Sequence, residues 1–187
     1  MAELGLERPH VVGLSFGSGL ALELFRRHPQ LPRSLVLASA YAGWAGSLGR
    51  DAAEQRREML LREAERPPEE VARDFSATLF VDSVPAALVD EAVALMSDFH
   101  PAGLRAMANA FADADLREVL PRIDVPTLLV YGDADQRSPL SVAEDLHAQI
   151  PDSKLVVIPG PGHAVNMEAP ERFNEVVREF LTGDPLR

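Results

Sequence analysis

Cysteine is absent from this chain of 187 residues. Its absence excludes disulfide bonds, thiolate zinc sites, iron–sulfur clusters and a cysteine nucleophile. Long apolar runs are also absent, because none reaches the roughly 18 residues that a membrane-spanning helix needs. The N-terminal sequence MAELGLERPH lacks the basic and apolar regions of a secretory signal. We therefore expect a cytoplasmic protein that does not enter a membrane.

Basic residues are scarce relative to acidic ones. The chain has 18 Lys and Arg against 29 Asp and Glu, which gives a formal net charge of −11. This balance argues against binding to nucleic acid or to an anionic membrane, because contacts to phosphate need a positive surface. A cationic partner is one explanation of the acidic surface. Solubility is the simpler one, since the acidic residues are spread along the whole chain.

The hydrophobic content of 47% fits one globular domain or two small ones. Four short apolar runs resemble strands that are buried on both faces of a parallel sheet. They are PHVVGLS (9–15), RSLVLASA (33–40), PTLLVYGD (126–133) and KLVVIPG (154–160). Three of these runs are each followed by a helical pattern. The last of these predicted helices begins at Pro170 and ends at Gly183. This alternation predicts the α/β class.

Residues 44–122 have a different pattern, in which helical stripes follow one another without a strand-like run. The stripes contain Val71, Phe75 and Leu79, then Leu88, Ala92, Leu95 and Met96, then Leu104, Met107, Ala108 and Phe111. Prolines lie at the breaks between them, as expected where helices begin. We therefore expect a core of residues 1–43 and 123–187, interrupted by a helical insertion at 44–122.

The first strand-like run leads into Gly13-Leu14-Ser15-Phe16-Gly17, and a helical pattern follows at once. A serine in a sharp turn of this kind needs glycines two residues away on each side, so that the backbone segments approach closely and the hydroxyl is exposed. Gly19 adds a small residue where the helix is expected to pack against its strand. The ordinary alternative is that Ser15 merely caps this helix.

An acidic residue and a histidine follow the last two strand-like runs, which end in Gly132-Asp133-Ala134-Asp135 and in Pro161-Gly162-His163. The carboxyl ends of parallel strands share one edge, which is where ligands bind to open α/β sheets. A serine hydroxyl becomes nucleophilic when a histidine takes its proton and a carboxylate orients that histidine. Asp133 fits the acid less well than a turn-forming role, and turn or surface roles for Asp135 and His163 are the alternatives.

With these three segments, the sequence resembles the α/β-hydrolase superfamily, in the branch of cap-bearing esterases, lactonases and carbon–carbon hydrolases. GLSFGSG resembles the nucleophile elbow, VPTLLVYGDADQRSP the acid-bearing strand and loop, and LVVIPGPGHAVNMEAPERFNEVVREFL the histidine loop and final helix. The resemblance implies an α/β-hydrolase fold with flanking helices and a helical cap at 44–122. It implies Ser15 as nucleophile, Asp135 as acid, His163 as base and the Phe16 N–H as an oxyanion donor.

The helical insertion also supplies candidates for substrate contact. Trp44, Met96, Met107 and Phe111, together with Phe80 and Phe99, are expected either to line an acyl pocket between cap and core or to form the core of the cap itself. The other histidines are expected to be ordinary surface residues. They are His10, His28, His100 and His147.

The resemblance further implies several strands before the nucleophile elbow, whereas here the elbow begins at Gly13. The first residues are interpreted as the end of the preceding helix, and no His-Gly pair marks a second oxyanion loop. The expectation is an N-terminally truncated hydrolase. Its first strand is expected to present an apolar edge that makes the chain poorly soluble, pairs with a second copy, or needs the missing segment.

The predicted function is that of a serine hydrolase acting on an ester, a lactone or a similar small carbonyl substrate. No cofactor or metal is implied. The expected partners are a small-molecule substrate and, through the exposed strand edge, a second copy of the chain. The alternative from another class is a non-catalytic remnant that binds a small molecule or a partner. Perhydrolysis and carbon–carbon cleavage use the same residues and stay open.

Overall fold

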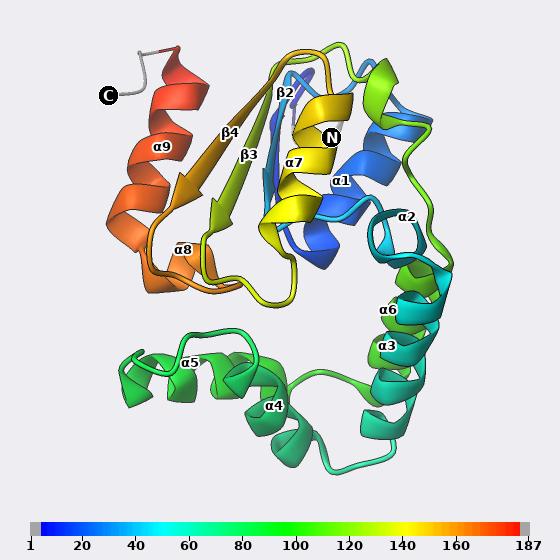
Figure 1. Ribbon diagram of the computed structural model, residues 1–187, viewed down its shortest axis with the longest axis vertical. Coiled ribbons are helices and arrows are strands. Elements are labelled where there is room, and N and C mark those ends of the chain that lie inside the picture. The colour runs from blue at the N-terminus through cyan, green and yellow to red at the C-terminus, as the bar shows by residue number, and fades with distance from the viewer. Residues whose placement is uncertain (1–4, 184–187) are drawn as a thin grey trace.

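Four parallel strands form the sheet of the computed structural model, which describes residues 5–183 (Figure 1). The strands are β1 (His10–Leu14), β2 (Ser34–Ala38), β3 (Thr127–Gly132) and β4 (Ser153–Ile158), and they lie in the order β1-β2-β3-β4. All four strands predicted from the apolar runs are present. The register pairs Leu14 with Ala38, Ala38 with Val130 and Val130 with Val156. The carboxyl ends of the strands therefore meet at one edge of the sheet.

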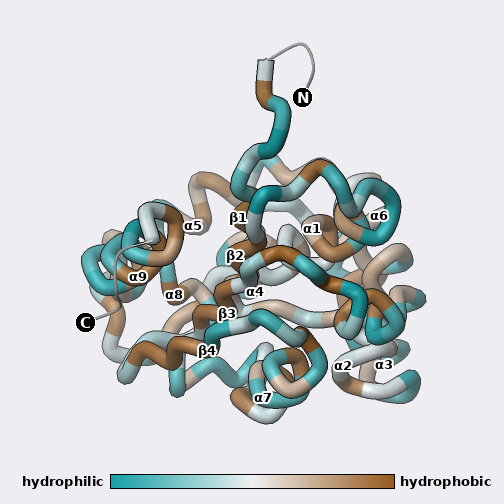
Figure 2. Tube along the Cα trace, turned by 90° about the horizontal axis from the view of Figure 1, so that it is seen from above, coloured by the Kyte–Doolittle hydropathy of each residue, from teal (hydrophilic) through white to brown (hydrophobic). Residues whose placement is uncertain are grey.

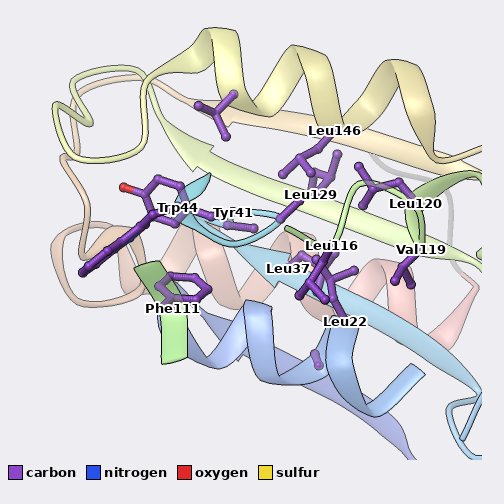
Figure 3. Packing of buried hydrophobic residues seen from close by; sticks show 14 of the residues in the cluster. Leu22, Leu37, Tyr41, Trp44, Phe111, Leu116, Val119, Leu120, Leu129 and Leu146 are labelled. Carbon is purple, nitrogen blue, oxygen red and sulfur yellow. The ribbon is translucent and has the colours of Figure 1, made fainter. Parts of the chain in front are cut away.

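Helices cover both faces of the sheet, as the alternation of strand and helix predicts. Helices α1 (Phe16–Arg27) and α7 (Leu140–Gln149) contribute Leu22 and Leu146 to one core, together with Leu37 and Leu129 from the central strands (Figure 3). Helices α8 (Val165–Glu168) and α9 (Pro170–Thr182) lie on the other face, as Figure 2 shows from above. There Val176 packs with Val36 and Val130 in a second core. Gly183 ends α9 with a φ of 78°, the predicted glycine cap.

The expectation that all four strands are buried on both faces is wrong for two of them. β2 and β3 are buried along their whole length, but β1 is buried only at Gly13 and β4 only at Ile158. Val12 of β1 is 52% exposed and Val157 of β4 is 38% exposed. The reason is position, since in the part of the chain that the structure describes β1 and β4 each have a neighbouring strand on one side only.

The segment between β2 and β3 is helical, as its pattern predicts. Its helices are α2 (Trp44–Leu48), α3 (Arg50–Glu63), α4 (Pro68–Ala77), α5 (Ala86–Ser97) and α6 (Pro101–Asp113), followed by the short 3₁₀ helix η2 (Leu120–Arg122). Pro68 and Pro101 begin α4 and α6. In Figure 1, α3 and α6 extend side by side away from the sheet, and α4 and α5 lie opposite the carboxyl ends of the strands. Helices α2 and α3 have no predicted stripe.

The segment before β1 differs from the sequence-based interpretation. Residues 5–9 form a turn and bends, so the helix expected before β1 is not present there. The remainder of that expected helix, residues 1–4, lies outside the described residues. Among residues 5–183, no helix is both long enough and apolar enough to cross a membrane.

Candidate active site

Ser15 lies in the tight turn between β1 and α1, with a φ of 52°. A left-handed conformation is uncommon for a residue with a side chain and is often found at functional sites. The turn is possible because Gly13 has no side chain, since a Cβ there would overlap the carbonyl group of Gly17. Gly17 itself has open space where a Cβ would be, so the close approach that was expected of both glycines depends on Gly13. Ser15 precedes α1, but its side chain makes no capping hydrogen bond.

Asp135 lies in the loop that follows β3. Its Oδ1 accepts hydrogen bonds from the backbone N–H groups of Arg137 and Ser138, both at 2.9 Å. Ser138 in turn donates its hydroxyl to the carbonyl oxygen of Ala40, at 2.8 Å. The carboxylate is thus oriented by its own loop, and this loop is tied to the residues that follow β2. The side chain of Asp135 is buried.

His163 lies in the loop that follows β4 and is also buried. The hydroxyl of Ser39 donates to the backbone carbonyl of His163, at 2.9 Å. A Cβ at Gly132 would overlap the carbonyl of Pro161, so this glycine allows the histidine loop to pass directly over the end of β3. The close contact between these two loops brings His163 toward Asp135.

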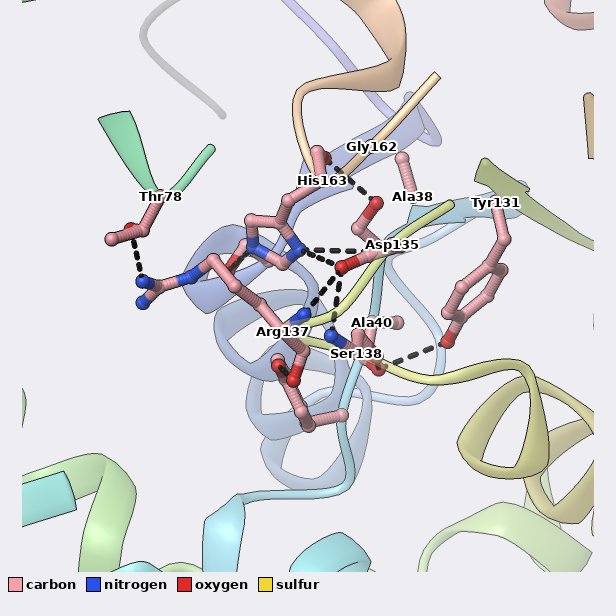
Figure 4. Close-up of polar contacts among 12 residues, drawn as sticks. Ala38, Ala40, Thr78, Tyr131, Asp135, Arg137, Ser138, Gly162 and His163 are labelled. Atoms are coloured by element: carbon pink, nitrogen blue, oxygen red, sulfur yellow. Dashed lines mark hydrogen bonds and ion pairs between the residues drawn. The ribbon is translucent and has the colours of Figure 1, made fainter. Parts of the chain in front are cut away.

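The three side chains form one continuous chain of hydrogen bonds, of which Figure 4 labels His163 and Asp135. His163 Nε2 lies 2.8 Å from Ser15 Oγ, and His163 Nδ1 lies 2.9 Å from Asp135 Oδ2 and 3.1 Å from Oδ1. Burial raises the pKa of Asp135, but hydrogen bonds from His163, Ser138 and Arg137 outweigh this effect and hold that pKa below its ordinary value. An ionised Asp135 keeps a proton on Nδ1, so that Nε2 faces the serine as a proton acceptor.

The residues that were weighed against these three have other contacts. Asp133 is exposed, and its Oδ1 accepts the N–H of Gly160 at 2.7 Å. The local turn expected of Asp133 is instead formed by Asp135, whose carboxylate accepts the N–H of Arg137, two residues ahead. The four remaining histidines are exposed, as predicted. Gly19 faces Phe111 of α6 instead of its own strand, because a Cβ at this position would overlap the Phe111 ring.

Phe16 is the first residue of α1, so its N–H has no acceptor within the helix. The side chain of Phe16 packs edge-on against Phe111, with the ring centroids 5.1 Å apart. The N-terminus of a helix attracts negative charge. The turn therefore presents a partial positive charge beside Ser15.

A cavity of about 380 Å³ opens onto Ser15 and His163. Its walls contain Trp44, Met96, Met107 and Phe111, the residues singled out as pocket candidates, and also Phe99. Phe80 does not line the cavity. Phe111 and Trp44 are also buried in the main core and pack against each other with ring centroids 5.4 Å apart. These two aromatic residues therefore belong both to the cavity wall and to the core, two alternatives that the sequence left open.

Several polar and charged residues of the cavity wall were not anticipated from the sequence, and three of them are joined by hydrogen bonds. These three are Tyr41, Arg56 and Arg137. The Tyr41 hydroxyl donates to the Arg137 carbonyl, and Arg56 donates to the same carbonyl at 2.8 Å. Arg137 stands two residues after Asp135, which was a usable signal in a chain with few basic residues. Arg56 gives no such signal, because α3 contains many charged residues on its surface.

Glu168 of α8 also escaped prediction, although it lies in the quoted histidine segment. Its carboxylate accepts the N–H of Gly162 at 2.8 Å and the N–H of Val81 at 3.0 Å. The N–H of Ala164 donates to the Leu79 carbonyl at 3.0 Å. These bonds join the histidine loop to the segment between α4 and α5. No group of three or more His, Asp or Glu side chains within residues 5–183 is arranged to bind a metal ion.

Comparison with known proteins gives consistent results. Residues 1–176 match the model of the alpha/beta hydrolase family. A pimeloyl-[acyl-carrier protein] methyl ester esterase of Neisseria meningitidis is 28% identical over 191 residues, covering 92% of this chain and 57% of the relative. Among solved structures, an esterase from Exiguobacterium antarcticum is 27% identical with a TM-score of 0.86, covering 97% of this chain and 69% of the other.

A thermophilic esterase from Thermogutta terrifontis, solved with malate bound, is 29% identical with a TM-score of 0.87. The match covers 98% of this chain and 68% of the esterase. The chain thus spans between 57% and 69% of the length of these three relatives. The parallel sheet with flanking helices, predicted as an α/β-hydrolase fold, is the fold that they share.

Proposed function

This chain belongs to the alpha/beta hydrolase family, and we propose that it is a serine hydrolase that cleaves an ester, a lactone or a similar small carbonyl substrate. One observation carries the proposal, namely the 2.8 Å contact between His163 Nε2 and Ser15 Oγ at the mouth of an apolar cavity. The names of the relatives, which include a methyl ester esterase, support ester hydrolysis as the reaction class.

In the first step, His163 Nε2 takes the proton of Ser15 Oγ as the oxygen attacks the carbonyl carbon of the substrate. A C–O bond forms, and the carbonyl π electrons move to its oxygen. The positive charge on the imidazolium is stabilised by the ionised Asp135 at Nδ1. Because the three groups are already in contact, little reorganisation is needed when the proton moves.

The N–H of Phe16 is the donor that this chain offers to the developing oxyanion. It points from the first turn of α1, where the helix dipole adds further positive potential. Each such donor typically contributes about 10²–10³ to the rate. Substitution of the Phe16 side chain leaves this N–H in place, so a donor on the backbone is protected from most mutations.

The intermediate then collapses and the bond to the leaving oxygen breaks. His163 returns its proton to that oxygen, which departs as an alcohol and leaves an acyl group on Ser15. In the second half-reaction, a water molecule loses a proton to His163 and attacks the acyl carbon. The acid product leaves, and the proton returns to Ser15 Oγ. No cofactor takes part in this sequence of steps.

We assign the acyl group of the substrate to the apolar part of the cavity. Trp44, Met96, Met107 and Phe111 provide a mostly apolar wall, which suits a hydrocarbon chain. All four residues come from helices of the insertion, Trp44 from α2, Met96 from α5, and Met107 and Phe111 from α6. We therefore assign the segment 44–122 the role of a cap over the core segments 1–43 and 123–187. The volume of about 380 Å³ suits a small or medium-sized substrate.

Labelling of the full chain with a fluorophosphonate, read by intact mass, tests the proposed nucleophile. We expect one adduct in the wild type, none in Ser15→Ala and strongly slowed labelling in His163→Ala. Ser141→Ala is the matched control, because Ser141 is an exposed serine on α7. Absence of an adduct from a folded wild-type sample would contradict the proposal and would favour a non-catalytic binding protein.

A panel of p-nitrophenyl esters and lactones then tests the reaction class. Turnover of an ester that is lost in Ser15→Ala supports hydrolysis. Hydrogen peroxide in the same assay separates perhydrolysis, because a peracid product forms only if peroxide replaces water at the acyl enzyme.

A further inference from the structure

Charged side chains interrupt the apolar wall of the cavity. Besides Glu63, they are the arginines Arg56, Arg66 and Arg137. Arg66 forms ion pairs with Glu63 at 2.5 Å and with Asp74 at 2.8 Å, so its charge is offset within the protein. Arg56 and Arg137 differ from it, because neither forms an ion pair with any carboxylate of residues 5–183. These two guanidinium groups leave the cavity with positive charge that is not paired.

The lack of a partner is notable in this chain. It has 29 acidic residues and 18 basic ones, so carboxylates are abundant and arginines elsewhere on the surface take them in ion pairs. Exposed arginines need no partner, because water solvates them. Arg56 and Arg137 are only half exposed and line the cavity that contains the reactive serine. Desolvation without a counter-charge costs free energy, which a bound anion recovers.

Arg137 has unused hydrogen-bonding capacity. One terminal nitrogen donates to the Thr78 hydroxyl at 2.6 Å, and the guanidinium lies over the Phe75 ring, 4.5 Å from its centroid. The Nε atom is buried and has no hydrogen-bond partner. A guanidinium offers five N–H donors in a planar fork, and a buried donor without an acceptor is costly. Arg137 is therefore fixed in position with a donor still unsatisfied.

Arg56 contacts both Arg137 and Tyr41, the aromatic residue next to His163. Its two terminal nitrogens donate to the Tyr41 hydroxyl at 3.0 Å and to the Arg137 carbonyl at 2.8 Å. Its guanidinium also lies 5.5 Å from the centroid of the Tyr41 ring, whose own centroid is 6.4 Å from that of His163. One aromatic ring therefore separates Arg56 from the catalytic histidine. Figure 4 shows the Arg137 side chain extending past His163 toward Thr78.

We propose that Arg137 and Arg56 bind a carboxylate group of the substrate, so that the preferred substrates are esters or lactones that also carry a free acid. A carboxylate has the planar, two-oxygen geometry that matches an arginine fork. Bound there, it supplies the counter-charge that the described chain lacks and places the scissile carbonyl at Ser15. This inference rests on the proposed ester-hydrolase function, because it concerns the substrate of the same site.

A binding measurement tests the site without relying on catalysis. Trp44 is the single tryptophan of the sequence and lines the cavity, so its fluorescence reports on occupancy. We expect glutarate to change this fluorescence in a saturable way, and 1,5-pentanediol, its uncharged analogue, to have little effect. Arg137→Gln is expected to raise the dissociation constant for glutarate about tenfold to a hundredfold, and Arg137→Lys less so.

Arg172→Gln is the matched control, because Arg172 on α9 pairs with Glu175 at the surface. It is expected to bind glutarate as the wild type does. Equal affinity of glutarate for the wild type and for both Arg137→Gln and Arg56→Gln would overturn the proposal, as would tighter binding of the diol.

Kinetics with a matched substrate pair gives the second test. We compare mono-p-nitrophenyl glutarate, which carries an acid, with neutral p-nitrophenyl valerate. The wild type is expected to favour the acid-bearing ester in kcat/KM, and Arg137→Gln to lose about tenfold or more of that preference, chiefly through KM. An equal loss for both esters indicates that Arg137 only supports the fold, and contradicts the inference.

The failure of this inference is distinguishable from failure of the proposed function. If neither ester is turned over and no fluorophosphonate adduct forms, the hydrolase proposal fails whatever glutarate does. If the serine is labelled and valerate is cleaved without any preference for the acid-bearing ester, only the carboxylate site fails.

Discussion

The ring of Phe111 lies directly against the Cα of Gly19, so that a Cβ at position 19 would overlap the ring. The contact joins α6 to α1, the helix that begins directly after Ser15. Phe111 has little room to move, because it is buried and packs against Phe16, Tyr41 and Trp44. We expect Gly19→Ala to destabilise the fold by about 1–2 kcal/mol, since overpacking outweighs the better helix propensity of alanine.

Gly17→Ala is the matched control for this substitution. It lies in the same helix, and a Cβ there has open space. We expect the free energy of unfolding to stay the same or to rise by up to about 1 kcal/mol. Urea denaturation of the two variants measures the difference. Equal stability of both variants would contradict the packing role assigned to Gly19.

The two aspartates of the loop after β3 provide a second prediction. Asp135→Asn removes the charge that orients His163 and stabilises its imidazolium, so kcat/KM for an ester is expected to fall about 10³–10⁴-fold. Asp133→Asn changes an exposed side chain that bonds Gly160, and we expect activity to stay within a few-fold of the wild type. Steady-state kinetics on p-nitrophenyl butyrate decides the matter. A larger loss of activity in Asp133→Asn than in Asp135→Asn would show that Asp133, and not Asp135, is the acid.

The pH dependence of stability follows from the same carboxylate. The pKa of Asp135 in the folded chain lies below its ordinary value of 3.8, because hydrogen bonds outweigh burial. Its stabilising contribution is therefore fully present above 3.8 and is lost as the pH falls through the lower folded value. The difference in free energy of unfolding between wild type and Asp135→Asn should be larger near pH 7 than near pH 3. Urea titrations at both values test this, and a gap that widens in acid would refute it.

Sequence patterns predicted the strands and the helices that pack on them, because these elements are marked by continuous apolar runs and by regular apolar stripes. Helix α3 was not predicted as an element, since only Ala53 and Leu60 of its residues are buried and they do not form a regular apolar stripe. It packs along α6. Most of its residues are strong helix formers, so the helix could have been predicted from propensity but not from an apolar stripe.

The three residues of the hydrogen-bonded site were predicted because glycines, strand ends and chain order mark them locally. Arg56 and Arg137 of the cavity were not predicted, because what distinguishes them is that they form no ion pair with a carboxylate of residues 5–183. Ion pairing depends on the three-dimensional arrangement of the side chains and cannot be read from the sequence. The same holds for Gly19, whose neighbour Phe111 is far along the chain. The exposed edge of β1 was expected from the strands missing before it, whereas the edge position of β4 was not, since apolar composition does not tell which strands have two neighbours.

Glu168 carries the last prediction. Glu168→Ala leaves the N–H groups of Gly162 and Val81 without their acceptor, and we expect a loss of about 1–3 kcal/mol in stability. The residue acts through its neighbour His163, so kcat should fall more than KM changes. Glu171→Ala, at an exposed position in the first turn of α9, is the control. An unchanged kcat in Glu168→Ala would show that the histidine loop keeps its position without this carboxylate.

The contact between Ser15 and His163 joins residues that are 148 positions apart. Within residues 5–183, Ser15 follows β1 and His163 follows β4, the two strands at the edges of the sheet. During synthesis on the ribosome, Ser15 therefore emerges long before its proposed base, which appears only with β4 and the loop that follows it. With Ser15 and His163 in the proposed roles, hydrolase activity requires that β1 and β4 be assembled in one sheet, and we expect a nascent or nicked chain with β4 detached to be inactive.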